Sequence, residues 1–141
     1  MRLSLLRPAL SPPPLYRPIY GGRVAAGFPS PAEDYVEARL DLNELLVAHK
    51  DATYFFRVRG DSMVGARVFD GDLLVVDRSK RPAHGLIVVA VINQELTVKR
   101  LYRRGGVIKL CTANPEYPDI TLTGDVELAI WGVVTGVVRK L

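Results

Sequence analysis

The chain is organised around residues 53–76, TYFFRVRGDSMVGARVFDGDLLVV, in which a short polar break separates two apolar runs. The runs Thr53–Val58 and Leu73–Val76 are short, rich in aromatic and β-branched residues and bounded by turn residues, which predicts buried strands. The break reads Gly60-Asp61-Ser62-Met63; its glycine allows close backbone approach and its aspartate can hold the turn. Ser62 is therefore a candidate nucleophile, with a simple turn-capping role as the alternative.

A second candidate, Lys99, lies in residues 95–102, ELTVKRLY, whose alternation predicts a strand. On that strand Lys99 shares a face with Thr97 and Leu101. Burial among apolar neighbours can lower a lysine pKa from its reference of about 10.4 by up to about 3 to 5 units. A neutral lysine beside a serine can act as a general base, as in Ser-Lys hydrolases. The alternative is a solvated lysine whose stem covers its neighbours.

The composition predicts one globular domain: 141 residues, 48% hydrophobic and 24% charged. The longest apolar runs are far shorter than the roughly 20 residues that cross a bilayer, and prolines interrupt any signal-peptide stretch near the start. We therefore expect a cytoplasmic protein with no membrane contact. Cys111 is the only cysteine, and His49 and His84 have no metal-ligand spacing. We expect no disulfide, no metal and no cofactor.

The formal net charge of +4 is concentrated at the N-terminus. Residues 1–26 contain four arginines and no acidic residue, whereas the remainder carries equal numbers of basic and acidic side chains. A nucleic-acid-binding domain would be expected to carry a basic stripe on its folded face. The charge distribution therefore predicts no strong direct DNA binding.

Residues 1–30 are rich in proline and glycine without amphipathic periodicity, which predicts a flexible, extended N-terminal arm ahead of a domain over 31–141. Within the arm, residues 23–29, RVAAGFP, are mostly small and apolar. Such a segment can enter a protease cleft as an added strand. A plain linker is the alternative.

The domain is predicted to be mainly β with one short helix. Leu42, Leu45 and Leu46 have helical spacing, with Asp41 as N-cap and Glu44 completing a capping box, and we expect this helix to pack one face on the core. Strands are expected over residues 52–59, 73–77, 86–92, 95–102, 107–111, 120–122 and 126–139. The architecture predicted is a compact set of curled sheets.

Several motifs, in this order and spacing, resemble the LexA/UmuD family of self-cleaving Ser-Lys peptidases. They include GDSM at 60–63, DGDLLVVD at 70–77 and LTVKRL at 96–101. FPSPAEDYVE at 28–37 and DLNELL at 41–46 are similar to the UmuD branch in particular. The resemblance extends over about residues 26–139 and implies a LexA/signal-peptidase-like fold of curled β-sheets.

The resemblance also implies which residues act. By the family pattern, Ser62 is the nucleophile, Lys99 is the general base and later the general acid, and the Ala26–Gly27 bond is cut. The backbone N–H groups of Ser62 and Met63 are the candidates for the oxyanion hole. No helix-turn-helix pattern precedes the domain, which agrees with the UmuD branch and not with the repressors.

The partners implied by the resemblance belong to the SOS response to DNA damage. They are a second copy in a homodimer, the RecA filament on single-stranded DNA that stimulates cleavage, and a UmuC-type subunit of an error-prone translesion DNA polymerase that takes the shortened form. Two alternatives stay open at this point. One is an adaptor of the same fold that does not cleave; the other is a peptidase acting on other proteins, against which the missing membrane anchor argues.

Overall fold

The computed structural model describes residues 2–9, 11–20, 36–124 and 129–141. The chain divides into two compact units. The larger unit comprises Met1–Pro8 and His49–Leu141, and the smaller unit comprises Ala9–Ala48. The predicted boundary between arm and domain, near residue 30, lies outside the described residues and stays a prediction. Within the predicted arm, Arg2–Leu6 and Tyr16–Tyr20 form strands that pair with other parts of the chain. No helix in the described ranges is long and apolar enough to span a membrane.

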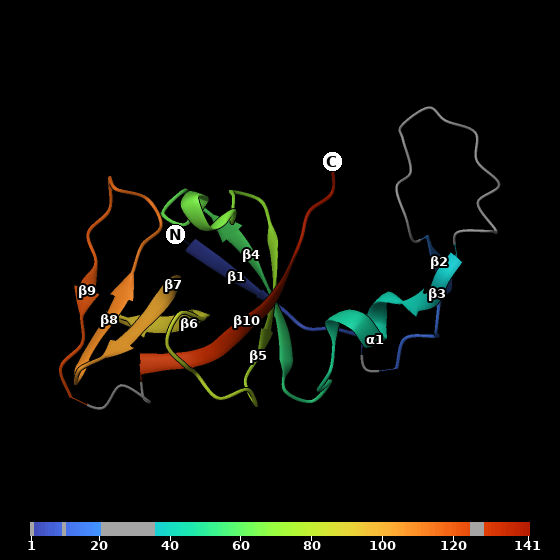
Figure 1. Cartoon of the computed structure of the whole chain (residues 1–141), viewed down its shortest axis with the longest axis horizontal. Helices are drawn as coiled ribbons and strands as arrows, with labels where there is room; N and C mark the ends of the chain where they lie inside the picture. Colours follow the sequence, from blue (N-terminus) through green and yellow to red (C-terminus); the bar gives the residue numbers. More distant parts are fainter. Residues whose placement is uncertain (1, 10, 21–35, 125–128) are drawn as a thin grey trace. The chain divides into compact units, whose positions relative to one another are not determined.

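The larger unit is built on one antiparallel sheet of eight strands (Figure 1). Their spatial order is β1-β4-β5-β10-β6-β7-β8-β9. The strands are β1 (Arg2–Leu6), β4 (Thr53–Arg59), β5 (Leu73–Asp77), β6 (Ile87–Ile92), β7 (Glu95–Arg104), β8 (Val107–Cys111), β9 (Ile120–Thr121) and β10 (Ile130–Val138). The prediction of a mainly β fold is confirmed, with the strands of this unit joined in a single sheet.

Two tight turns fix the pairing of β6, β7 and β8. Asn93 and Gln94 have positive φ angles of 49° and 67°, and Gly105 and Gly106 have φ angles of 57° and 74°. Two consecutive positive φ angles are typical of the two-residue hairpin turn whose twist matches that of the strands. The second turn carries pairing out to Arg104, so β7 is two residues longer than predicted.

The sheet is buried on both faces, because alternate residues of its central strands enter two apolar clusters. Val89 and Val98 belong to the first cluster, whereas Val88 and Leu101 belong to the second. The buried members of the first are Phe56, Val58, Met63, Val68, Leu74, Val76, Val89 and Val98. Those of the second are Val88, Ala90, Leu101, Leu110 and Val133. This double burial makes the sheet a rigid support for the loops at its ends.

The unit Ala9–Ala48 contains β2 (Tyr16–Tyr20), β3 (Val36–Asp41) and α1 (Leu42–Leu46). The predicted helix and its N-cap are confirmed: the side chain of Asp41 accepts a hydrogen bond of 3.0 Å from the N–H of Asn43. Glu44 instead accepts a hydrogen bond from the hydroxyl of Tyr16, 3.1 Å away. The expected capping box is therefore not completed among the described residues.

The prediction that this helix packs its leucine face on the core is wrong. Leu42 and Leu45 are each 60% exposed, and α1 has no buried residue. The reason is that α1 directly continues β3, in a unit whose sheet has only two strands. Two strands offer too little apolar surface to bury a helix face.

The packing of β10 against β5 leaves no space for a side chain at Gly132. A Cβ at this position would lie 2.8 Å from Cγ1 of buried Val76 on β5. We expect Gly132→Ala to lower the free energy of unfolding by about 1 to 3 kcal/mol, because a well-packed core has no space for the added methyl. Denaturant unfolding monitored by circular dichroism measures the change.

Val76→Ala supplies the control for this prediction. In that background the clashing methyl is gone, so Gly132→Ala should cost clearly less than in the parent chain, and the two substitutions should be non-additive. Equal costs in both backgrounds would contradict the packing explanation.

Candidate active site

Ser62 lies in the turn that follows β4 and is only 1% exposed. The turn begins at Gly60, which has a positive φ of 103° and whose N–H donates a hydrogen bond of 2.8 Å to the carboxylate of Asp70. A short 3-10 helix, Val64–Ala66, follows. The backbone around the serine is thus held on both sides, as its sequence predicts.

The segment that follows β8 fixes this turn through its backbone. Ala113 donates its N–H to the carbonyl of Ser62 over 2.9 Å and accepts the N–H of Gly65 over 2.7 Å. A Cβ on Gly65 would lie 2.5 Å from the carbonyl oxygen of Ala113. Any side chain at position 65 would therefore push the two segments apart.

Side chains of the same segment reinforce the link. The amide of Asn114 donates to the carbonyl of Asp61 over 3.0 Å, and the hydroxyl of Tyr117 donates to the carboxylate of Asp61 over 2.6 Å. The sequence does not predict these contacts, because Asn114 and Tyr117 lie 53 and 56 residues after Asp61 in the chain. The available signal was Asp61 itself, a carboxylate beside the serine for which no partner had been assigned.

The hydroxyl of Ser62 is buried and has no hydrogen-bond partner among the described residues. Leaving a buried polar group unsatisfied costs about 1 to 3 kcal/mol. Such a group in a native structure calls for an explanation, and a catalytic role is one of them. The hydroxyl is thus not committed to capping the turn, which was the alternative considered from the sequence.

Lys99 lies in the middle of β7 and is 6% exposed. Its Nζ donates hydrogen bonds to the hydroxyl of Thr97, 3.0 Å away, and to the carbonyl of Val98, 3.1 Å away. The first of these confirms that Lys99 and Thr97 share a face of the strand. Burial lowers the pKa of Lys99, since it disfavours the charged ammonium. The alternative of a solvated lysine is wrong.

The backbone connects the serine turn to the strand of the lysine. Cys111, the last residue of β8, pairs with Arg100, the neighbour of Lys99, and the chain then continues to Ala113, which binds the carbonyl of Ser62. The side chains themselves are not joined: among the described residues the hydroxyl of Ser62 has no partner, and Lys99 donates only to Thr97 and Val98.

The remaining predicted site residues have different outcomes. The side chain of Met63 is fully buried in the first apolar cluster, so any part that Met63 takes in a site falls to its backbone. The N–H groups of Ser62 and Met63 donate to no acceptor within the described ranges. Ala26 and Gly27 lie outside the described residues.

A second constellation contains a serine, a histidine and an aspartate, but it is not arranged as a triad. Nδ1 of His49 lies 2.7 Å from Asp77, while the hydroxyl of Ser79 donates to the same carboxylate over 2.6 Å. In a triad the serine would instead be hydrogen-bonded to the histidine. Asp77 thus fixes a turn. Burial by itself would raise the pKa of the Asp77 carboxyl, but the hydrogen bonds from Ser79 and His49 outweigh it and hold this pKa below its usual value. Within the described ranges no group of histidine, cysteine and acidic side chains is arranged to hold a metal ion.

Comparison with known proteins assigns the chain to a family. The family model described as Peptidase S24-like matches residues 18–135, which include both Ser62 and Lys99. Protein MucA of Salmonella typhimurium is 50% identical over 119 residues, covering 84% of this chain and 81% of MucA. Protein SamA of the same species is 44% identical over 138 residues, covering 98% and 96%.

The match extends to a repressor. The LexA repressor of Paracidovorax citrulli is 42% identical over 119 residues, which cover 84% of this chain and 53% of the repressor. The family model spans most of the chain, and the match covers 81% of MucA and 96% of SamA, two relatives similar to UmuD. The chain belongs to the Peptidase S24-like family, as a member of the UmuD type.

Proposed function

We propose that this protein is a self-cleaving serine peptidase of the SOS response, which cuts its own Ala26–Gly27 bond with Ser62 as nucleophile and Lys99 as general base. The observation that carries the proposal is a pair of buried polar groups in one small unit. One is a serine hydroxyl without a partner among the described residues, and the other is a lysine whose pKa is lowered by burial. Neither arrangement adds to stability, and together they match the needs of a Ser-Lys peptidase.

The hydrogen bonds of Lys99 suit a neutral amine. A neutral amine has two N–H donors and one lone pair, and its two donors go to Thr97 and to the carbonyl of Val98. The lone pair is then left to accept the proton of the serine hydroxyl. An ammonium would carry a third N–H with no acceptor assigned to it among the described residues.

The reaction follows from these roles. The hydroxyl oxygen of Ser62 attacks the carbonyl carbon of Ala26 while Lys99 takes its proton. The N–H groups of Ser62 and Met63 stabilise the oxyanion that forms. Lys99 then gives the proton to the departing amine of Gly27, which leaves an ester between Ala26 and Ser62. A water molecule deprotonated by Lys99 hydrolyses the ester and restores the enzyme.

Regulation in this proposal lies in the docking of the scissile segment. Tethering the bond to its own site gives a high effective concentration, so modest chemical reactivity is sufficient. A RecA filament on single-stranded DNA would accelerate cleavage by binding the docked form preferentially. The shortened protein, as a cytoplasmic homodimer, would then serve a UmuC-type subunit of an error-prone translesion polymerase.

A second candidate is an adaptor of the same fold that binds such a polymerase without cleaving itself. It is favoured by one observation, the lack of a hydrogen bond between Ser62 and Lys99 in this structure. The cleavage experiment separates the two candidates, since an adaptor would stay intact.

Incubation of the purified full chain should yield a product that begins at Gly27, detected by mass spectrometry. The product should form at alkaline pH alone, and near neutral pH when RecA, single-stranded DNA and a nucleotide are added. Ser62→Ala and Lys99→Ala should each abolish it, because one removes the nucleophile and the other the base. Lys109→Ala, on the neighbouring strand β8, is the matched control and should be cleaved normally. A chain that stays intact in every condition would favour the adaptor.

The rate of unassisted cleavage should rise with pH. Only the neutral amine of Lys99 can take the serine proton, and its fraction grows tenfold per pH unit below its pKa. Because burial lowers that pKa, the rate should level off below the value of about 10.4 expected for a solvated lysine. Quenched time courses across this range measure the profile, and a flat or falling profile would contradict Lys99 as the base.

Tyr117→Phe should slow cleavage about fivefold without unfolding the chain, because it removes the hydrogen bond that holds Asp61 next to the serine. Tyr102→Phe is the matched control, since no described residue accepts a hydrogen bond from the hydroxyl of Tyr102. Both rates can be read from the same mass-spectrometric time course. Equal rates for the two variants would show that this contact does not position the site.

A further inference from the structure

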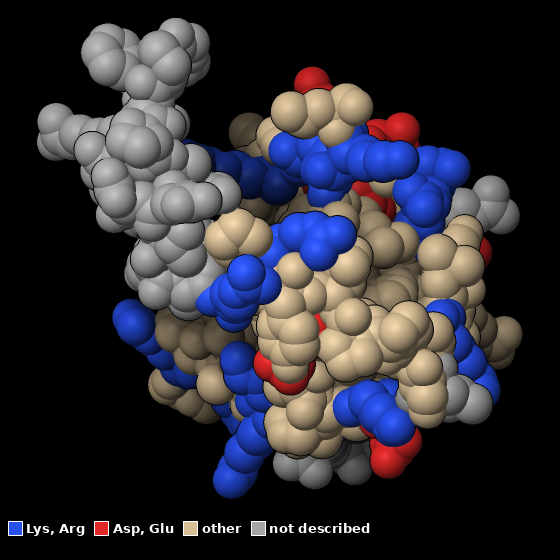
Figure 2. Space-filling model, turned by 90° about the vertical axis from the view of Figure 1, so that its right-hand side faces the viewer, with Lys and Arg blue, Asp and Glu red and all other residues tan. Residues whose placement is uncertain are grey.

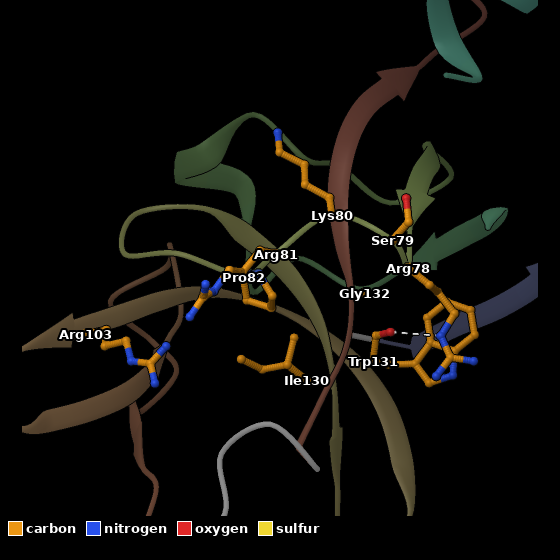
Figure 3. Close-up of a pocket in the computed structure, with 9 residues that line it drawn as sticks. All are labelled: Arg78, Ser79, Lys80, Arg81, Pro82, Arg103, Ile130, Trp131 and Gly132. Atoms are coloured by element: carbon orange, nitrogen blue, oxygen red, sulfur yellow. Dashed lines mark hydrogen bonds between the residues drawn. The ribbon is translucent and has the colours of Figure 1, made fainter. Parts of the chain in front are cut away.

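A hollow of about 310 Å3 lies between the loop after β5 and the start of β10. Four of its described lining residues are basic, namely Arg78, Lys80, Arg81 and Arg103, and none of the described lining residues is acidic (Figure 3). Positive charge is thus concentrated at this hollow, although the residues after position 26 carry equal numbers of basic and acidic side chains overall. None of its described lining residues belongs to the serine turn.

Arg78 is held in place by Trp131. Its guanidinium lies 4.2 Å from the centroid of the indole ring, and its Nε donates to the carbonyl of Trp131 over 3.0 Å (Figure 3). The ring in turn packs edge-on against Tyr54 and Phe56 of β4. Arg78 is thus a preorganised cation whose terminal nitrogens stay available, which lowers the entropic cost of binding an anion.

The other three cations are exposed and make no ion pair with any described residue. Asp77, just before the loop, makes no ion pair with these three cations, and its two oxygens are hydrogen-bonded to His49 and Ser79. A group of cations around a hollow, with no ion pair among the described residues, attracts anions. The apolar side chains of Pro82 and Ile130 supply part of its wall.

The arrangement of the charged ends indicates the form of the anion. In Figure 3 the end of Lys80 points away from the guanidinium groups of Arg81 and Arg103, and Arg78 lies on the opposite side of the hollow. A single small anion would need donors that converge on one point. Cations spread along a rim instead suit a chain that carries a charge at each repeat, as a nucleic acid backbone does.

We propose that this hollow binds the backbone phosphates of single-stranded DNA. Three of the four cations are arginines, whose forked donors match phosphate oxygens. A single strand can bend from one cation to the next, whereas a rigid duplex cannot follow so small a hollow. On the face shown in Figure 2, acidic side chains are interspersed among the basic ones. The contact is therefore local, weak and salt-sensitive, and it does not depend on the proposed cleavage.

Fluorescence anisotropy with a labelled oligothymidylate and the full chain tests the proposal. The pocket variant combines Lys80→Glu with Arg81→Glu, two exposed positions that hold no described contact. The control variant combines Arg59→Glu with Lys140→Glu, also exposed and at the opposite ends of β4 and β10. Both variants change the formal charge equally, so a difference between them reports the location of binding.

We expect the pocket variant to bind at least about tenfold more weakly than the control variant. Between about 50 and about 200 mM salt, its slope of log affinity against log salt should be shallower by about 1.4, at about 0.7 per lost phosphate contact. Equal losses in the two variants would overturn the site. Equal or tighter binding of polyglutamate of matched length, lost in the same variant, would assign the hollow to an acidic peptide. Competition by inorganic phosphate as strong as that by the oligonucleotide, per phosphate, would assign it to a small anion.

Discussion

The geometry of the candidate site depends on one pair of backbone hydrogen bonds. Ala113 binds the carbonyl of Ser62 and the N–H of Gly65, which joins the serine turn to the continuation of β8. Because β8 pairs with β7, this link sets the position of the turn relative to the strand that carries Lys99. The contact is so close that position 65 tolerates only glycine. A small backbone constraint thus connects two motifs that are far apart in the sequence.

The sheet supports polar groups that oppose stability. Two groups reduce the free energy of unfolding: a buried hydroxyl with no partner among the described residues, and a desolvated lysine. For the hydroxyl the loss is about 1 to 3 kcal/mol. The two apolar clusters, one on each face of the sheet, offset this loss. Such destabilising groups persist where the surrounding structure holds them, and they are concentrated at functional sites.

Local patterns explain why most of this fold could be predicted and some of it could not. Alternation identified β7 and the face of Lys99, because this signal acts within a few residues. The partners of Asp61 could not be predicted, since Tyr117 reaches it only after β8 has paired with β7. The prediction that α1 is buried was wrong, because the spacing of apolar residues reveals an apolar helix face but not whether another element covers it. The basic hollow was missed because net charge averages over the whole domain.

The state of Lys99 also limits where control of the proposed reaction can lie. Its amine is already buried and its pKa is already lowered, so part of the desolvation that the base requires is present in this structure. What this structure lacks is a hydrogen bond between that amine and the hydroxyl of Ser62. In the proposed mechanism, a docked substrate strand therefore acts by aligning two prepared groups. Alignment of this kind is a shift between populated conformers, which a partner can bias by binding one of them more tightly.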